Sequence, residues 1–439
     1  MEVRIDPRDF ILAPYWECPK CHKPEAYGVL SVRGNSYTRR CKECRHTEDY
    51  GLPPLDKKVI YLDQFAISNI MKSLNPKTKA NKRGRIDKFW SDLFDKIYIL
   101  CRAQLMICPY SDIHECESVV TPYSSELRRA YELFSHGVSF LPHKNIEFSQ
   151  VYKHAEKQIL GIDSPLNKSH VIVGGLNEWQ ERIIITVRLS ISQEDIDGLR
   201  KVRDSVHEGL SRVFARWQQE HDKKFMDWYN EEVMAYGQNV IRRYHDYYSM
   251  PKSEIDAALR NGMTEKLQPP MEVAVFNAVQ QLFLQSVIPE SETFLKTEQY
   301  FLSSRLQEIP SLKISAMLLA AIARKAAAGQ KKTPTQGIAY DIAAISSFLP
   351  CCDAMFIDNE CDAYLHEHPL CDELNYGTKT FSLNTRDAFV AYLDEVSANA
   401  PNEHMKKVVE VYGEKWNQPY RDIYLDDEKR RKEESSEST

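Results

Sequence analysis

Four acidic side chains occupy positions from which they can reach a common point. Asp63 follows an apolar, strand-favouring run, Val59 to Leu62, and a helical pattern begins directly after it. Asp358 likewise follows a short apolar run, while Glu115 and Asp341 stand near the starts of helical patterns. Because the ends of parallel strands and the starts of the helices that follow them lie at one edge of a sheet, we expect these four carboxylates to converge.

Converging carboxylates predict a bound divalent cation. Four such groups would repel one another unless a positive ion neutralised them, and oxygen ligands are those that Mg²⁺ or Mn²⁺ takes. A metal held in this way polarises a phosphate and lowers the pKa of a water, which is the chemistry of phosphodiester hydrolysis. The sequence contains no motif for a serine, cysteine or histidine nucleophile, and this chemistry requires none.

Some of the acids have alternative interpretations. The second acid is Glu115 or Glu117, and we favour Glu115 because it lies one turn inside its helix; Asp112 is equally well explained as a helix cap. Asp353 precedes Asp358 by five positions, which in an extended strand places it on the opposite face and about 16 Å away, so we expect it to be structural or to support the metal ligands from behind. The whole set could also consist of caps and turn residues on an inert α/β scaffold.

The amino-terminal segment predicts a zinc ribbon. Cys18, Cys21, Cys41 and Cys44 form two C-x-x-C pairs around a hairpin pattern that turns at Arg33-Gly34-Asn35. Four thiolates suit tetrahedral Zn²⁺, and a segment this small needs a metal to compensate for its small core. His22 or His46 could replace one cysteine. The ribbon also carries a basic surface that could contact phosphates, formed by Arg33, Arg39, Arg40, Lys42 and Arg45.

Composition limits the classes of function. The 439 residues include 57 Lys and Arg against 63 Asp and Glu, so a nucleic-acid partner would need a local basic patch. No apolar run approaches the roughly 20 residues of a membrane span, and the amino terminus lacks a signal-peptide pattern. The odd total of 11 cysteines favours metal binding and reduced thiols over a disulfide framework. We therefore expect a soluble, cytoplasmic protein without membrane contact.

Two further segments bear on partners. Residues 72–88 are rich in Lys and Arg and are broken by Pro and Gly, which predicts an exposed basic loop beside the acids that contacts nucleic acid or is merely solvated. Residues 161–310 have helical periodicity and predict an insertion, used for homo-oligomerisation or substrate selection. Tyrosines and arginines alternate within 229–248; we favour a packing face over base stacking there.

The acidic motifs resemble those of a known family. YLDQ at 61–64, PYSDIHE at 109–115, Asp341 with AAISS, and FIDN at 356–359 look like the four motifs of PIN-domain nucleases, and in particular of larger bacterial PIN-like proteins with helical insertions. The 17 positions between Asp341 and Asp358 fit that family. The fourth motif departs from it, since a small hydroxyl residue usually precedes the Asp.

The resemblance implies a fold and an activity. The fold would be α/β, a PIN-like parallel sheet flanked by helices, divided into a zinc ribbon (1–54), two halves of a PIN-like domain (55–160 and 311–392), the insertion (161–310), and a carboxyl-terminal helix with a disordered tail (393–439). The activity would be that of a Mg²⁺- or Mn²⁺-dependent endoribonuclease acting on single-stranded RNA, with DNA as another substrate. Asp63, Glu115, Asp341 and Asp358 would be its catalytic metal ligands. Such proteins serve as toxins, antiviral defence effectors or RNA-processing enzymes.

A non-enzymatic function is the main alternative. In that hypothesis the zinc ribbon and the basic loop bind nucleic acid, and the α/β domain is an inactive nuclease that serves as an adaptor. It predicts salt-dependent binding without a metal-dependent product. A third hypothesis is a nuclease that stays silent until an operon partner releases it.

Overall fold

A four-stranded parallel sheet lies at the centre of the molecule. The computed structural model describes residues 6–181, 192–263 and 267–424. The strands are β5 (Lys58–Leu62), β6 (Met106–Ile107), β9 (Ala354–Phe356) and β10 (Lys379–Phe381), in the spatial order β10-β9-β5-β6. All three neighbouring pairs are parallel, and Leu62 lies opposite Phe356. The expected class, a mixed α/β fold with a parallel sheet, is therefore confirmed, with the central pair of strands drawn from distant parts of the chain.

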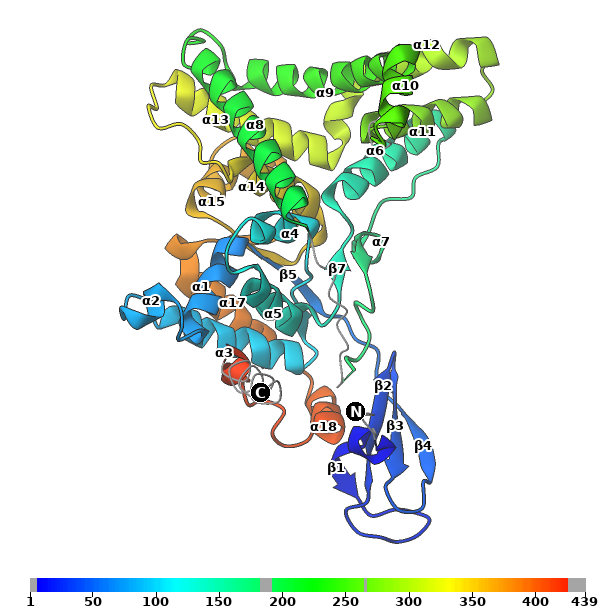
Figure 1. Ribbon diagram of the computed structural model, residues 1–439, viewed down its shortest axis with the longest axis vertical. Helices are drawn as coiled ribbons and strands as arrows, with labels where there is room; N and C mark the ends of the chain where they lie inside the picture. Colours follow the sequence, from blue (N-terminus) through cyan, green and yellow to red (C-terminus); the bar gives the residue numbers. More distant parts are fainter. Residues whose placement is uncertain (1–5, 182–191, 264–266, 425–439) are drawn as a thin grey trace.

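Helices cover both faces of this sheet (Figure 1). Ile60 and Leu62 of β5 point into one core, against α1 (Gln64–Leu74), α3 (Phe89–Arg102), α5 (Ser124–Ser135) and α17 (Arg386–Ala398). Val59 and Tyr61 point into the other core, against α6 (His143–Leu160), α13 (Pro310–Ala327) and α14 (Ile338–Phe348). Successive side chains of a strand alternate between faces, and both faces of β5 are apolar because both are covered.

The remaining elements complete this layer and its edges. On the side of the acids lie α2 (Lys79–Lys82), α4 (Asp112–Val119) and α15 (Asn359–His366). Four further elements are short: β7 (Ser139–Phe140), α7 (Lys168–Val171), β8 (Ile172–Val173) and α16 (Leu370–Glu373). The carboxyl-terminal helix is α18 (Asn402–Tyr412). Strands expected at 59–62 and 354–357 and helices expected after them are present, within one or two residues at most ends.

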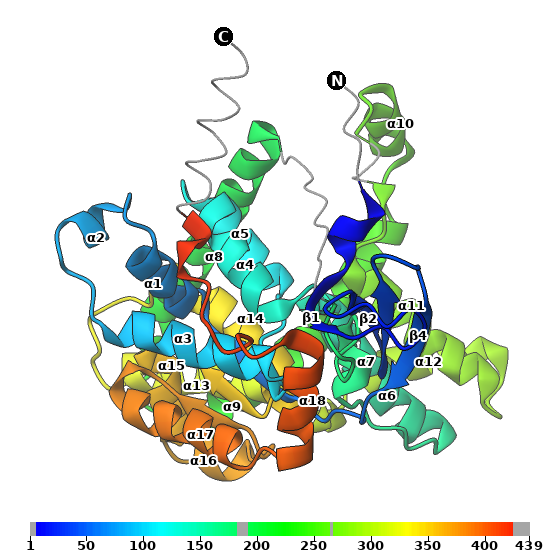
Figure 2. The same ribbon diagram turned by 90° about the horizontal axis from the view of Figure 1, so that it is seen from below.

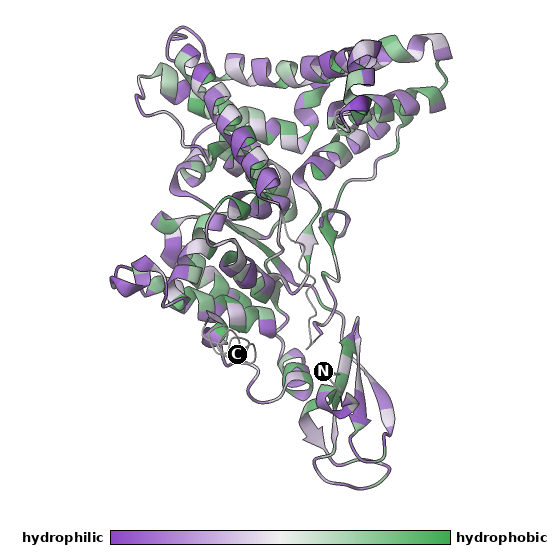
Figure 3. Ribbon diagram, in the orientation of Figure 1, coloured by the Kyte–Doolittle hydropathy of each residue, from purple (hydrophilic) through white to green (hydrophobic). Residues whose placement is uncertain are grey.

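The expected helical insertion is present. It consists of α8 (Gln193–Trp217), α9 (Phe225–Tyr248), α10 (Lys252–Arg260), α11 (Met271–Gln285) and α12 (Glu290–Phe301). Figure 3 shows hydrophilic colours dominating α8, whose outer face is exposed. The tyrosine-rich stretch is a packing face: Tyr229 is buried and Tyr244 contacts Phe276. Helix α9 packs so closely that a Cβ on Gly237 would come within 1.8 Å of the Phe301 carbonyl oxygen, so this position requires glycine.

The amino-terminal ribbon packs against the carboxyl-terminal helix α18. It is an antiparallel sheet of β1 (Leu12–Trp16), β2 (Tyr27–Arg33), β3 (Ser36–Cys41) and β4 (Thr47–Gly51), with the expected hairpin turn at Gly34. Arg39 was expected on the basic surface but is fully buried. Its guanidinium stacks on Trp16 and donates to the carbonyl oxygens of Pro14, Tyr27 and Glu410. Arg39 thus joins the ribbon to α18 and has no free face for a phosphate.

None of the helices within the described ranges is both long enough and apolar enough to cross a membrane.

Candidate metal and nucleic-acid site

Asp63 and Asp358 lie side by side because the two strands that carry them are neighbours. Asp63 follows β5 and Asp358 follows β9 by one further residue, and the Asp63 amide donates to the Phe356 carbonyl oxygen at 3.0 Å. Each aspartate caps the helix that follows it. Asp63 Oδ1 accepts from the Phe65 amide (3.1 Å), and Asp358 Oδ1 accepts from the amides of Glu360 and Cys361. A cap holds a carboxylate in one orientation, so one oxygen of each is fixed and the second is directed elsewhere.

Asp341 approaches these residues from the first turn of α14. Its carboxylate, that of Asp358 and the Cys361 thiol have ligand atoms within 4.8 Å of one another. The second oxygen of Asp358 is buried and has no hydrogen-bond partner among the described residues. An unpartnered buried carboxylate oxygen is costly. This one lies beside the Asp341 carboxylate, where a cation could interact with both groups.

Glu117, rather than Glu115, is the acid that α4 directs toward this cluster. Glu115 precedes Glu117 by two positions, which places it on the other side of the helix, and it forms a 2.8 Å ion pair with Arg128 of α5. Glu117 lines the same cleft as the three aspartates. Gln64 lies beside it: in the amide orientation that satisfies both polar atoms of its side chain, the nitrogen donates to Glu117 Oε2 at 3.1 Å and the oxygen accepts from the Ser118 amide at 3.2 Å. The expectation of Glu115 is therefore corrected. The buried side of α4 carries Ile113 and His114. Glu117 lies four positions after Ile113 and three after His114, so a helix places it on the same side.

Three of the clustered carboxyl groups, those of Asp63, Glu117 and Asp341, have raised pKa values. Burial, followed by Asp63 as a charged neighbour, raises the pKa of Glu117 to about 8, and burial together with Asp358 raises that of Asp63 to about 7. Burial raises the pKa of Asp341 well above its usual range, and Asp63, Asp358 and Glu117 raise it further. Like charges held close in a medium of low dielectric constant disfavour ionisation in this way. A divalent cation would reverse every one of these shifts.

His114 positions the end of strand β5. It is buried, stacks on Tyr61 with ring centroids 5.0 Å apart, and its Nε2 donates to the Leu62 carbonyl oxygen at 2.8 Å. Burial lowers the pKa of His114 to about 4, so the ring is neutral near pH 7. The ring ties α4 to the residue directly before Asp63, and thus sets the separation of Glu117 and Asp63.

The acids form the floor of an open cleft of about 530 Å³. One wall is α1, and the other is the segment that joins α4 to α5. The lining residues besides the four acids are Gln64, Phe65, Ser68, Asn69, Met71, Lys72, Thr121, Tyr123 and Leu127. The cleft is therefore acidic at its floor and mixed polar and aromatic along its walls, and it is wide enough for part of a polymer as well as for an ion.

The helical insertion reaches the rim of this cleft. Arg200 of α8 donates to the Val120 carbonyl oxygen at the end of α4, and Asp204 accepts from Gln336 just before α14. The charge of Arg203, between them on the same helix, lowers the pKa of Glu117 against the effect of burial. Helix α8 thus holds α4 and the start of α14 together, which places Glu117 and Asp341 on a common support.

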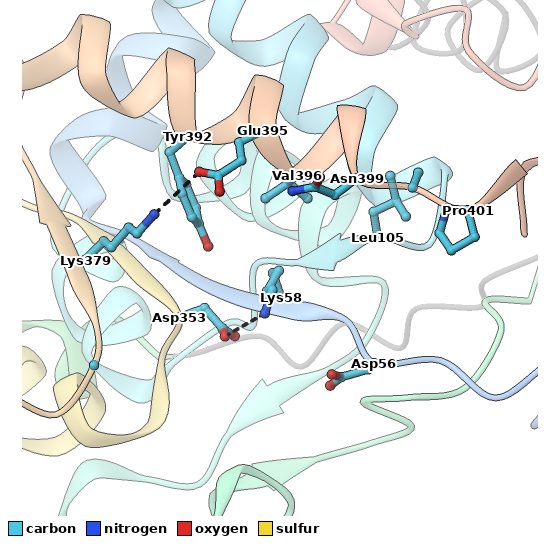
Figure 4. Close-up of a pocket in the computed structure, with 12 residues that line it drawn as sticks. Asp56, Lys58, Leu105, Asp353, Lys379, Tyr392, Glu395, Val396, Asn399 and Pro401 are labelled. Atoms are coloured by element: carbon cyan, nitrogen blue, oxygen red, sulfur yellow. Dashed lines mark hydrogen bonds and ion pairs between the residues drawn. The ribbon is translucent and has the colours of Figure 1, made fainter.

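Asp353 lies at the opposite end of the sheet and has a structural role, as expected. Its Oδ2 accepts from the Val59 amide at 2.8 Å and from Lys168, and Lys58 lies 3.4 Å from Oδ1. Figure 4 shows Asp353 and Lys58 in a second cavity, of about 390 Å³, which lies near the starts of β5 and β10. Asp112 is likewise structural: it accepts from the amide and the ring of His143, while Ser111 caps α4.

The four ribbon cysteines can hold a zinc ion. Their sulfur atoms all lie within 4.8 Å of one another, with Cys18 and Cys44 at 3.5 Å and Cys21 and Cys41 at 3.8 Å. Tetrahedral coordination with Zn–S bonds of about 2.3 Å requires sulfur atoms about 3.8 Å apart. His22 and His46 instead pair with Glu17 and Glu48, so neither replaces a cysteine. Another group of potential ligands, His368, Cys371 and Asp372, lies on the surface.

A matched pair of variants tests the choice of the second acid. We expect Glu117→Gln to lower metal-dependent cleavage by about 10²-fold or more, because a metal-site carboxylate contributes several kcal/mol of charge stabilisation. Glu115→Gln on the same helix removes only a surface ion pair, worth about 0–1 kcal/mol, and should cleave at close to the wild-type rate. The measurement is initial cleavage rate at saturating Mn²⁺. Equal loss in both variants would contradict the assignment.

Sequence reasoning gave Cys361 and Gln64 no role in this site, and it assigned Lys72 to an exposed loop, whereas Lys72 belongs to α1. Cys361 lies against the acids, where burial and the carboxylates raise its pKa well above the usual range, so it remains a thiol. Gln64 and Lys72 line the cleft from α1, and their spacing of two helical turns from one another is the pattern that could have indicated a common face.

Comparison of the chain with profiles of known protein families, with curated proteins and with solved structures finds no match.

Proposed function

We propose that the protein is a metal-dependent nuclease that hydrolyses phosphodiester bonds in single-stranded RNA. The observation that supports it most is the gathering of Asp63, Glu117, Asp341 and Asp358 on the floor of one open cleft. A cluster of this kind is costly without a cation, and sites with perturbed carboxylates in a cleft are typically functional. The strand ends and helix starts that carry these acids are also the arrangement that the PIN-like motifs imply.

The residues fit a hard divalent cation such as Mg²⁺ or Mn²⁺. The donors are carboxylate oxygens, the buried second oxygen of Asp358 has no partner among the described residues, and the floor is open to a cleft. Asp63, Asp341 and Asp358 would hold the ion and Glu117 would complete its surroundings. When bound, the ion supplies Lewis-acid activation of the phosphate and of the attacking water.

The chain itself contributes position and charge. The caps on α1 and α15 fix Asp63 and Asp358, and His114 fixes the approach of α4. Gln64 lies beside Glu117 and, in the amide orientation that satisfies both of its polar atoms, donates to one oxygen of this carboxylate. Hydrogen bonds that fix the acidic side chains in this way keep them aligned, so that they need not reorganise during the reaction.

The direct test is cleavage of labelled single-stranded RNA and DNA by purified protein with EDTA, Mg²⁺ or Mn²⁺. We expect products from RNA with either metal and none with EDTA. Tight binding without any product under all three conditions would favour the non-catalytic adaptor. Products that are insensitive to EDTA would overturn the metal assignment.

The raised pKa values predict how Mg²⁺ changes stability with pH. The carboxyls of Asp63 and Glu117 have folded-state pKa values near 7 and 8, against ordinary values of 3.8 and 4.5. Their contribution to stability in the metal-free protein is therefore fully present below pH 4 and is lost as the pH rises through 7 and 8. Because Mg²⁺ competes with these protons, we expect 5 mM Mg²⁺ to raise Tm by about 5 °C at pH 8 but only about 1 °C at pH 6.

The control for this experiment is Asp358→Asn, which removes a ligand oxygen. In this variant the Mg²⁺-induced rise in Tm should disappear at both pH values. A rise in the wild-type protein of the same size at pH 6 and pH 8 would show that the ion binds elsewhere.

A further inference from the structure

Helix α1 presents a row of polar side chains along the cleft. Gln64, Ser68 and Lys72 stand at successive turns and all line the cavity whose floor carries the acids. With a rise of about 1.5 Å per residue, Lys72 is displaced about 12 Å along the helix from Gln64. This distance is about two nucleotides of an extended strand, at roughly 6 Å between phosphates. The row thus leads from the candidate metal site to the ammonium group of Lys72.

Lys72 is held in the cleft without an anionic partner. It is half-buried, and within residues 6–181, 192–263 and 267–424 no carboxylate forms an ion pair with it. Burial lowers its pKa, which reflects the loss of water around the ammonium group. A partly desolvated cation is unfavourable until an anion approaches it, so the position is prepared for a negatively charged group.

The facing wall offers surfaces for unpaired bases. The half-buried ring of Tyr123 lines it, and the half-buried ring of Phe65 adds aromatic surface on the side of α1. Aromatic and apolar side chains beside a track of phosphate-binding groups are the combination that binds single-stranded nucleic acid, because every base has a face that can stack. Bases in a duplex are already stacked and paired, and so have no such face to offer.

The basic segment continues the track beyond Lys72. The Lys72 carbonyl oxygen accepts from the side chains of Thr78 and Asn81 (both 3.3 Å), and the Ser73 carbonyl accepts from Asn81 at 3.0 Å. These bonds fasten α2 beside the end of α1, as Figures 1 and 2 show. Within residues 79–85 the exposed cations are Lys79, Lys82, Arg83 and Arg85. They therefore lie beside the end of the cleft that Lys72 occupies.

We propose that Lys72 binds a backbone phosphate of a single-stranded nucleic acid about two nucleotides from the bond over the acids, and that the strand leaves the cleft across the basic segment at 79–85. The position of the scissile bond rests on the proposed nuclease function. The phosphate site at Lys72 and the path of the strand rest on the cleft alone.

Binding without cleavage tests this proposal. The probe is a fluorescent 12-nucleotide RNA, with the DNA of the same sequence and the RNA duplex as further arms, titrated with Asp341→Asn protein without added divalent metal. In this background we expect Lys72→Ala to weaken single-strand binding about 10-fold and to reduce the salt slope by about 0.7, the value for one phosphate contact on a single strand. Lys72→Arg keeps the charge and should bind within about threefold of the parent.

Lys252→Ala is the matched control. Lys252 is exposed on α10 of the insertion, away from the cleft, and its removal should leave affinity and salt slope unchanged. Lys72→Ala binding as tightly as this control, or the duplex binding as tightly as the single strand, would overturn the proposal. If the wild-type protein cleaves RNA but Lys72 proves irrelevant, only this inference fails. If Lys72 governs binding but no metal supports cleavage, the nuclease fails and the phosphate site remains.

Discussion

Asp341→Asn is expected to abolish metal-dependent cleavage and, at the same time, to make the metal-free protein more stable. Burial raises the pKa of this carboxyl most, and four nearby acids, Asp63, Asp358, Glu117 and Glu360, raise it further, so an uncharged amide of the same shape removes repulsion. We expect Tm without metal to rise by about 2–5 °C, corresponding to about 1–2 kcal/mol in a chain of this size. Cleavage should fall by about 10³-fold or more, since a charged ligand is lost where phosphate charge must be balanced.

Asp353→Asn is the matched control, because it makes the same chemical change at the other end of the sheet. Asp353 accepts from Val59 and pairs with Lys58 and Lys168, so its neutralisation should lower stability, by about 1–3 kcal/mol, and leave the chemistry of the cleft intact. The two variants are thus expected to change Tm in opposite directions. Thermal unfolding in EDTA and initial cleavage rates in Mn²⁺ measure both effects. An Asp341→Asn protein that is less stable and still active would refute the cluster as a metal site.

Cys41→Ser is expected to release bound zinc and to unfold the ribbon. Cys41 is buried, and its sulfur lies 3.8 Å from that of Cys21, so its loss leaves three thiols around the position of the ion. Metal binding supplies much of the folding free energy in modules of this size, about 10 kcal/mol or more in isolated zinc-finger peptides. The docked surface on α18 should stabilise the ribbon in part. We therefore expect loss of one zinc per chain and a Tm lower by about 5–10 °C.

The measurements are zinc content and hydrogen exchange across residues 12–51. Exchange should also rise in α18, because Arg39 donates to the Glu410 carbonyl oxygen and the ribbon residues Val29 and Val32 pack on this helix. Cys371→Ser removes an exposed thiol in a different surface group and should leave one zinc bound. A Cys41→Ser protein that retains a full equivalent of zinc and normal protection would show that the four thiols do not hold the ion.

Local patterns in the sequence were sufficient to predict the elements that carry the acids. The runs before Asp63 and Asp358 read as strands because they are continuous and apolar, which is what a strand buried on both faces requires. The helices after them follow from capping aspartates and helical spacing, and these signals are local. The cysteine spacing likewise indicated the ribbon, since metal geometry constrains the positions of the ligands closely.

The choice between Glu115 and Glu117 depended on tertiary contacts. Both acids follow Ser111 in one short helix, and only the packing of α4 decides which of them faces the cleft. His114 binds the Leu62 carbonyl oxygen, and that contact turns Glu117 inward and Glu115 toward Arg128. The burial of Arg39 was also unpredictable from the sequence. Within its basic stretch, no local pattern distinguishes this arginine, which stacks on Trp16, from its more exposed neighbours.

By itself, the sequence determined the strands, the helices that follow them, the acids at their junctions and the zinc-binding thiols, because each depends on residues close together in the chain. Only the tertiary structure decided that β5 lies beside β9, that α8 and His114 support the acid cluster, and that Lys72 lines the same cleft as the acids. The pairing of β5 with β9 joins segments nearly 300 positions apart, and the contacts of His114 and α8 join segments 52 and 80 positions apart. Their geometry follows from which apolar faces pack together.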